Sequence, residues 1–167
     1  AVGSETGDAV TTGSDNTLIG DNAGGALTTG GNNVAVGSGA LLVATTAADN
    51  TAVGTLALTA NSSGTDNTAV GYAAGDAVTT GSDNTLVGDN AGGALTTGGN
   101  NVAIGSGALL VATTAADNTA VGTLALTANS SGTDNTAVGY AAGDAVTTGD
   151  ANTFVGDNAG GATTTAD

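Results

Sequence analysis

The chain has 167 residues, of which 15 are acidic and none is Lys, Arg or His, so its formal net charge is −15. Without a cationic side chain it has no means of neutralising nucleic-acid phosphates or an anionic membrane surface, and we expect no nucleic-acid partner and no membrane insertion by this segment. The lack of His and Cys excludes the usual zinc and thiolate chemistry.

The sequence is repetitive from its first residue to its last. One apolar residue, then Val or Ile, then Gly recurs every 17 residues, and the repeats start at 1, 18, 35, 52, 69, 86, 103, 120, 137 and 154. Residues 18–85 and 86–153 are copies of a four-repeat module, differing only at the pairs Ile19/Val87, Val36/Ile104, Ser82/Asp150 and Asp83/Ala151. We expect a single repeat array over 1–167, and we expect it to be an excerpt of a longer chain.

The first expected element is a strand that runs from the end of one repeat into the next, as in residues 50–53, and stops at Gly54. The second position of the repeat is always Val or Ile, and such β-branched side chains favour a pleated, buried surface. The invariant Gly after it indicates a positive φ or a backbone approach too close for a Cβ. The sixth position is Ala in all repeats except the first, where it is Thr6, and this predicts a tight interior corner.

A second strand is expected through positions nine to twelve, as in residues 77–80, with Gly, Asn and Asp forming the corners. The sixteenth position is Asn in every complete repeat, and we interpret this column as an amide ladder between successive coils. The predicted structural columns contain Val2, Ile19, Val36, Val53, Val70, Val87, Ile104, Val121, Val138 and Val155; Gly3, Gly20, Gly37, Gly54 and Gly71; and Asn16, Asn33, Asn50, Asn67 and Asn84.

Together these columns predict the fold class. Helix is excluded because Gly and β-branched residues at this density cost too much helix propensity. The remaining alternatives are a disordered low-complexity chain and a parallel β-solenoid, and the unbroken 17-residue period favours the solenoid. The predicted fold is all-β, a parallel β-solenoid of ten coils.

The strand offers more apolar surface than one thin coil can enclose. Successive side chains of a strand point to opposite faces, so Ala52 and Val53 cannot both face inward. The apolar runs 41–43 and 109–111 raise the same difficulty. We therefore expect one face to pack against another copy of the chain.

The run Asn-Thr-Ala-Val-Gly at 50–54 and 67–71, followed by Ala three positions after the Gly, resembles the head repeats of trimeric autotransporter adhesins (the YadA-like head). The runs that continue into Tyr, at 67–72 and 135–140, are similar to those of phage tail-fibre proteins. The resemblance covers the whole chain, although adhesin head repeats are typically shorter. It implies a left-handed parallel β-roll, a homotrimer, and an extracellular, cell-surface or virion location.

The function expected from this resemblance is structural: a rigid shaft or head in a fibre or adhesin, with self-association as a homotrimer or an end-to-end filament and a host-surface receptor as a further partner. We expect no enzyme activity, because nothing breaks the repeat to form a unique pocket. The alternative is an ice-binding solenoid that uses its Thr columns, although the adjacent Thr11 and Thr12 point to opposite faces and give one outward column.

A row of Asp at the fifteenth position suggests calcium as a second alternative, since calcium prefers oxygen ligands. The glycine-rich nonapeptide of calcium-binding β-rolls is absent, and Asn32, Asn100 and Ala151 interrupt the row. We therefore expect no cofactor beyond weakly held calcium. The row consists of Asp15, Asp49, Asp66, Asp83, Asp117 and Asp134.

Overall fold

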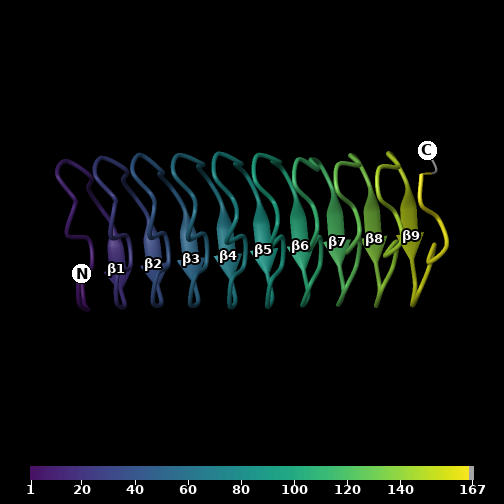
Figure 1. The fold of residues 1–167 in the computed structure, drawn as a ribbon, viewed down its shortest axis with the longest axis horizontal. Helices are drawn as coiled ribbons and strands as arrows, with labels where there is room; N and C mark the ends of the chain where they lie inside the picture. The colour runs from purple at the N-terminus through teal and green to yellow at the C-terminus, as the bar shows by residue number, and fades with distance from the viewer. Residues whose placement is uncertain (166–167) are drawn as a thin grey trace.

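The computed structural model describes residues 1–165, which form a parallel β-solenoid without a helix. Nine strands lie side by side in chain order in one parallel sheet (Figure 1). Each strand pairs with the next at a separation of 17 residues, as Ala52 does with Ala69. The prediction of parallel coils with this period is therefore confirmed. The strands are β1 (Thr17–Ile19), β2 (Val34–Val36), β3 (Thr51–Val53), β4 (Thr68–Val70), β5 (Thr85–Val87), β6 (Val102–Ile104), β7 (Thr119–Val121), β8 (Thr136–Val138) and β9 (Thr153–Val155).

The predicted strand that ends at the invariant Gly is present, but the second predicted strand, at residues 77–80, is wrong. In this segment the carbonyl oxygen of Thr96 accepts the backbone N–H groups of both Thr79 (2.9 Å) and Thr80 (3.4 Å). A strand would send consecutive N–H groups to opposite sides, so this shared acceptor belongs to a turn. Each coil therefore has one strand, and irregular backbone forms the rest of it.

The valine column of the strand was expected to face the interior, but it is the other side of the strand that does so. The central residue of each strand points inward, and Ala52 is fully buried, whereas Val70 is 37% and Ile104 is 39% exposed. The expectation of a buried valine column is therefore wrong. The coil is thin, so the inward position of the strand holds Ala, or a larger residue (Leu, or Phe154 in β9) where the opposite wall carries Gly.

Large inward side chains alternate between the two walls of the solenoid. Leu86 points inward from β5, and the facing position of the same repeat is Gly92. In the repeat that starts at Ala52, the wall opposite the strand supplies Leu58 instead. A Cβ added to Gly92 would lie 2.8 Å from Leu86 Cδ2, so the two positions compete for one volume. The repeat that starts at Ala69 has Gly75 at the seventh position and no large side chain at either, and there Val78 and the leucines of the two neighbouring coils fill the interior.

The invariant Gly ends every strand for both of the predicted reasons. All ten members of this column have φ between 129° and 141°. A Cβ on Gly88 would lie 2.6 Å from the carbonyl oxygen of Gly105 in the next coil. Coils can therefore stack at strand spacing at this corner only when the side chain is a hydrogen atom.

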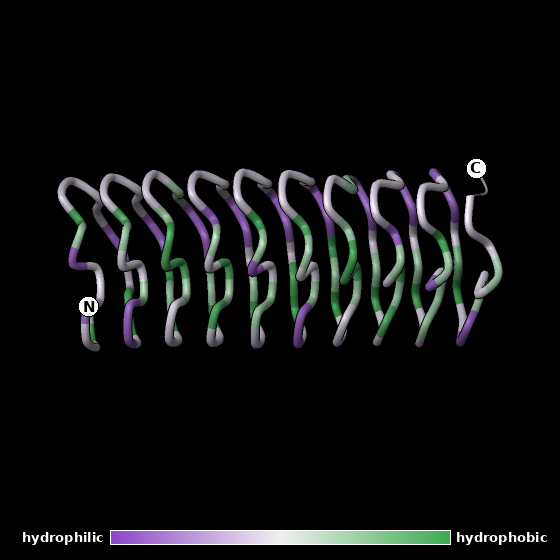
Figure 2. The backbone as a smooth tube through the Cα atoms, in the orientation of Figure 1, coloured by the Kyte–Doolittle hydropathy of each residue, from purple (hydrophilic) through white to green (hydrophobic). Residues whose placement is uncertain are grey.

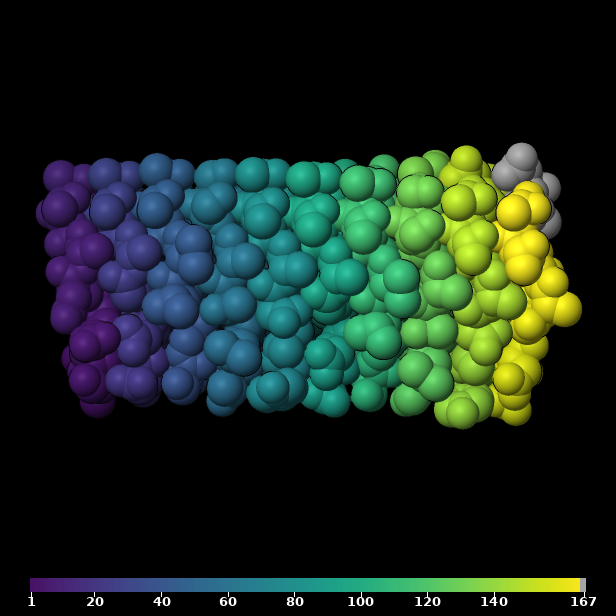
Figure 3. Space-filling model, in the orientation of Figure 1, coloured from purple at the N-terminus to yellow at the C-terminus, as the bar shows by residue number. Residues whose placement is uncertain are grey.

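The result is an even rod. Hydrophilic segments follow the upper part of each coil, and apolar segments follow the strand and the wall behind it (Figure 2). The space-filling view shows the coils stacked along one axis without a deep cleft on the visible side (Figure 3).

Candidate functional site

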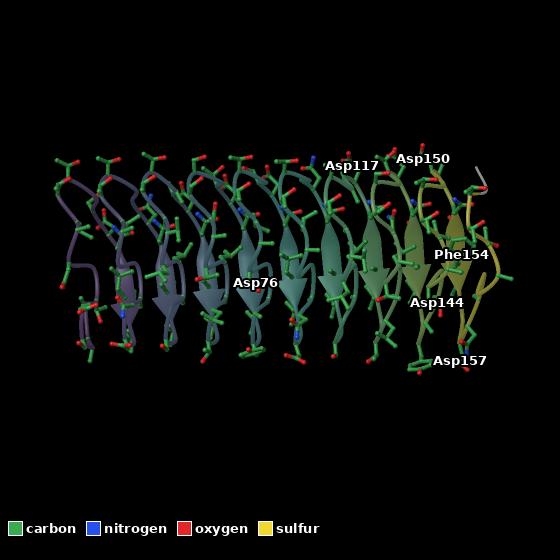
Figure 4. All side chains as sticks on the ribbon, viewed as in Figure 1. Asp76, Asp117, Asp144, Asp150, Phe154 and Asp157 are labelled. Carbon is green, nitrogen blue, oxygen red and sulfur yellow. The ribbon has the colours of Figure 1, made fainter. Side chains whose placement is uncertain are left out.

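Each coil has two broad faces joined by two edges. We call the side formed by the strands the front face, and the segment behind them, such as residues 57–62, the back face. The upper edge corresponds to residues 63–66 and the lower edge to residues 54–56 of the same coil. Asp117 marks the upper edge and Asp157 the lower edge in Figure 4. The sequence-predicted columns and the acidic residues distribute over these four surfaces.

The asparagine column lies inside the upper edge, where most of its members are fully buried. Asn67 Nδ2 donates to Asn50 Oδ1 (3.1 Å) and to the carbonyl oxygen of Gly81 (2.9 Å). Asn67 Oδ1 in turn accepts the backbone N–H (3.1 Å) and Nδ2 (3.0 Å) of Asn84. Within residues 1–165, no buried side-chain nitrogen or oxygen lacks a partner. The protein itself uses these amides, and they brace one coil against the next.

The two adjacent Thr/Ser columns have different roles. The hydroxyl of Thr79 donates to the carbonyl oxygen of Thr96 (3.1 Å). Equivalent bonds of 2.8–3.2 Å join every step of this column from Thr11 to Thr164. The following residue, such as Thr80, is exposed. The pair therefore offers one outward rank of hydroxyls, because the other rank is bonded to the backbone.

The acidic row on the upper edge follows the backbone conformation. All nine residues of this column, including Asn32, Asn100 and Ala151, have φ between 57° and 61°. Asp and Asn tolerate this left-handed region better than other residues with a Cβ. Residues 1–165 contain no group of three or more Asp and Glu side chains placed to hold a metal ion. The turn conformation accounts for the row without a metal.

The back face has an open hollow of about 430 Å³ near the N-terminal end of the array. Polar side chains of Glu5, Asp8 and Asn22 line one part of it, and Leu42 and Val43 line another. The hollow opens where the eighth position of a repeat is Gly, so that no side chain covers the gap between the preceding and following coils. It has a mixed lining and no buried polar group without a partner.

The residues of this hollow recur one module further along the back face. Asp76 and Gly93 occupy the positions of Asp8 and Gly25, whereas Ala73 replaces Glu5. Val111 is 47% exposed, as Val43 is 46% exposed. Burial raises the pKa of the Asp76 carboxyl above its usual value of 3.8, although backbone hydrogen bonds at Asp76 and Ala77 act in the opposite direction. The back face therefore changes from coil to coil with the period of the four-repeat module.

The front face is the surface that the sequence analysis missed. The first and third residues of each strand point outward, as Thr68 and Val70 do on either side of the buried Ala69. In a strand, outward positions alternate with inward ones. The first and third residues of each strand triplet were therefore the signal in the sequence that could have located the front face. The two outward ranks consist only of Thr, Val and Ile.

Residues 1–165 contain no helix with the length and hydropathy of a membrane span. No protein-family model, curated protein or solved structure matches the chain. The geometry of the four surfaces is therefore the main basis for a functional proposal.

Proposed function

We propose that this chain is a structural repeat segment of an extracellular or virion fibre or adhesin, in which it acts as a rigid shaft or head and not as an enzyme. The observation that carries the proposal is the unbroken parallel register from β1 to β9, in which every strand pairs with the next at the same 17-residue step. An architecture of this kind grows in length by adding repeats, which suits a spacer.

Three sets of bonds between neighbouring coils support the role of a stiff shaft. The strands form one ladder, the buried asparagines form a second, and the hydroxyls of the column that contains Thr79 form a third. These bonds lie at the front face, inside the upper edge and on the back face, so bending that opens any of these surfaces must stretch them. With ten coils at roughly 4.8 Å each, the shaft would be about 48 Å long.

The proposal includes the association of copies of the chain side by side. On the back face, Leu42 and Val43 form an apolar patch that recurs at Leu110 and Val111, and the two valines are 46% and 47% exposed. Because the patches recur once per module, they would fix the axial register of neighbouring copies, which a uniform surface would not do. We propose that copies meet at these patches. Three left-handed chains side by side agree with the adhesin-like repeats, and an adhesive head would have a host-surface receptor as its further partner.

The test is the mass per length of the purified chain by electron microscopy, combined with its mass in solution. A rod with the mass of three chains is expected, and the double variant Val43→Asp/Val111→Asp should dissociate it. The control, Thr46→Asp/Thr114→Asp, adds the same two charges at exposed positions on the upper edge and should leave the assembly intact. A wild-type chain that stays monomeric at all concentrations would contradict the proposed assembly, and equal dissociation of both variants would contradict its location.

A further inference from the structure

The front face is free of charge on a strongly acidic protein. Its outward residues are Thr or Val at the first position of each strand and Val or Ile at the third. Every acidic residue among residues 1–165 lies on the edges or the back face, although the formal net charge of the whole chain is −15. A surface without charges does not attract a cationic partner, and it does not repel a neutral one.

The outward side chains of the front face form two straight ranks. Each strand pairs in register with the next, so Thr51 lies beside Thr68, and Val53 lies beside Val70. Neighbours in a rank are about 4.8 Å apart, and the two ranks are separated by about 6.6 Å, which is two residues of strand rise. Figure 1 shows the strands in one straight row along the rod.

The side chains of these ranks are also fixed in orientation. Thr, Val and Ile branch at Cβ and have restricted χ1 rotamers, so their methyl groups keep regular positions without a partner. The outward hydroxyls of strand threonines such as Thr85 and Thr119 make no hydrogen bond within residues 1–165, and they face solvent. The face is thus a regular grid of methyl and hydroxyl groups whose side chains have little conformational entropy to lose on binding.

A neutral grid with two constant spacings fits a partner that is itself a lattice. We propose that the front face binds ice, because it is neutral and regular and its coil repeat is close to a distance that recurs between water oxygens along one axis of ice. Water ordered between the methyl groups can join such a lattice through the free hydroxyls. A second copy of the chain fits less well, since a face that changes so little from coil to coil would hold it only weakly against sliding by one coil. The upper edge also fits less well, because it has one rank of hydroxyls beside a row of carboxylates.

The experiment measures thermal hysteresis and ice-affinity partitioning of the whole chain, with its mass in solution recorded in the same samples. The test variant is Thr68→Tyr/Thr136→Tyr, which places two large side chains in the middle of the front face, at strand positions where Tyr is well accommodated. The control is Thr80→Tyr/Thr148→Tyr, which adds the same side chains to exposed positions on the upper edge. Circular dichroism melting establishes that both variants keep the solenoid.

Hysteresis in the wild type and the control, with loss in the front-face variant, is the expected result. Absence of hysteresis in a folded wild-type chain, or equal hysteresis in both variants, would overturn the proposal. A wild-type assembly that shows no hysteresis and that the front-face variant dissociates would overturn the ice proposal and assign this face to a second copy. The patch variants Val43→Asp/Val111→Asp leave the front face unchanged, so a failed fibre proposal and a failed ice proposal are distinguishable.

Discussion

The front and back faces of this solenoid are built from the same repeats but differ in how much their side chains vary along the rod. The outward side chains of the front face are only Thr, Val and Ile, and Val replaces Thr once per module, at Val34 and Val102. The back face repeats every four coils, and its eighth position changes from Asp76 to Gly93 to Leu110 to Thr127. A uniform face suits a partner with a regular lattice, and a modulated face suits a partner that must be held in register.

This difference originates in the backbone. The strand ladder forces in-register stacking, so outward side chains on the front face must tolerate identical neighbours about 4.8 Å away. Asp or Glu there would stack like charges, and neutral β-branched residues avoid this repulsion. The irregular back face turns its side chains in varied directions, with left-handed residues such as Leu58 (φ 49°) and Gly75 (φ 59°). It can therefore accommodate a hollow or an apolar patch.

The largest expected effect is a difference in stability between two adjacent substitutions, one in the interior and one on the front face. Ala52 is fully buried, so Ala52→Asp should cost at least about 4 kcal/mol and unfold the array locally or entirely. Val53 points outward, and Val53→Asp should cost about 1 kcal/mol or less. Thermal unfolding followed by circular dichroism measures both. Comparable losses for the two variants would mean that the inward and outward ranks of β3 are assigned the wrong way round.

The second effect concerns the back wall, which supplies the interior with its large side chains. Leu58 is fully buried, and Leu58→Ala should destabilise the protein by about 2–5 kcal/mol through lost contacts and a cavity. Val43, on the outer side of the same wall, is 46% exposed, and Val43→Ala should cost about 0.5 kcal/mol in the isolated chain. Urea unfolding at low protein concentration provides the comparison, because it keeps lateral association from masking the second value.

The third effect tests whether glycines on the back face are needed for conformation or for space. Leu58 shows that a side chain can occupy the left-handed seventh position. Gly75 has the same conformation, but a Cβ there would lie 2.6 Å from Leu86 Cδ1, so Gly75→Ala should cost about 1–3 kcal/mol through overpacking.

The matched control for this glycine is Gly93, which occupies the position of Gly25 one module further along the back face. Its added Cβ would meet its nearest neighbours at 3.3 Å, and Gly93→Ala should change stability by about 0.5 kcal/mol or less. Denaturant midpoints measure both variants. If Gly93→Ala proves the more damaging substitution, the neighbours of this back-face glycine are less able to move than those of the interior.

Much of the fold was predictable, and the errors have identifiable causes. The period and the strand follow from columns of β-branched residues and Gly. The predicted orientation of the strand was wrong because Val is usually buried in sheets, whereas here the inward position is the one before it, which holds Ala52 or, opposite a Gly, a larger residue such as Leu86. The exchange of Leu86/Gly92 for Ala52/Leu58 was visible in the sequence, and it indicates that the first and seventh positions share one volume.

The back face was harder to predict. The left-handed fifth position, which leads into it, and its own left-handed seventh position hold Leu, Ala, Asn, Glu and Gly alike, so no residue preference marks them. The supposed strand at 77–80 had a typical β composition, but its N–H groups share one acceptor. The hollow depends on Gly25 lying beside Leu42 of the next coil, a relation that appears only when the repeats are stacked.

The smallest expected effect is a pH dependence confined to the back face. Burial raises the folded-state pKa of Asp76 above the usual 3.8, so the folded protein holds this proton more tightly than the unfolded chain does. Below pH 3.8 both states are protonated and the group costs nothing. As the pH rises through the folded-state pKa, the buried carboxyl must ionise, and stability falls.

Asp76→Asn removes this penalty, so its melting temperature should exceed that of the wild type at pH 7 and equal it at pH 3. Asp66→Asn is the control: it removes one charge from the upper edge, and Asn suits its φ of 58°. A gain at pH 7 shared by both variants measures relief of the general negative charge. The burial of Asp76 is measured by how far the melting-temperature gain of Asp76→Asn exceeds that of Asp66→Asn. If the two gains are equal, the Asp76 carboxyl is as well hydrated as those on the upper edge.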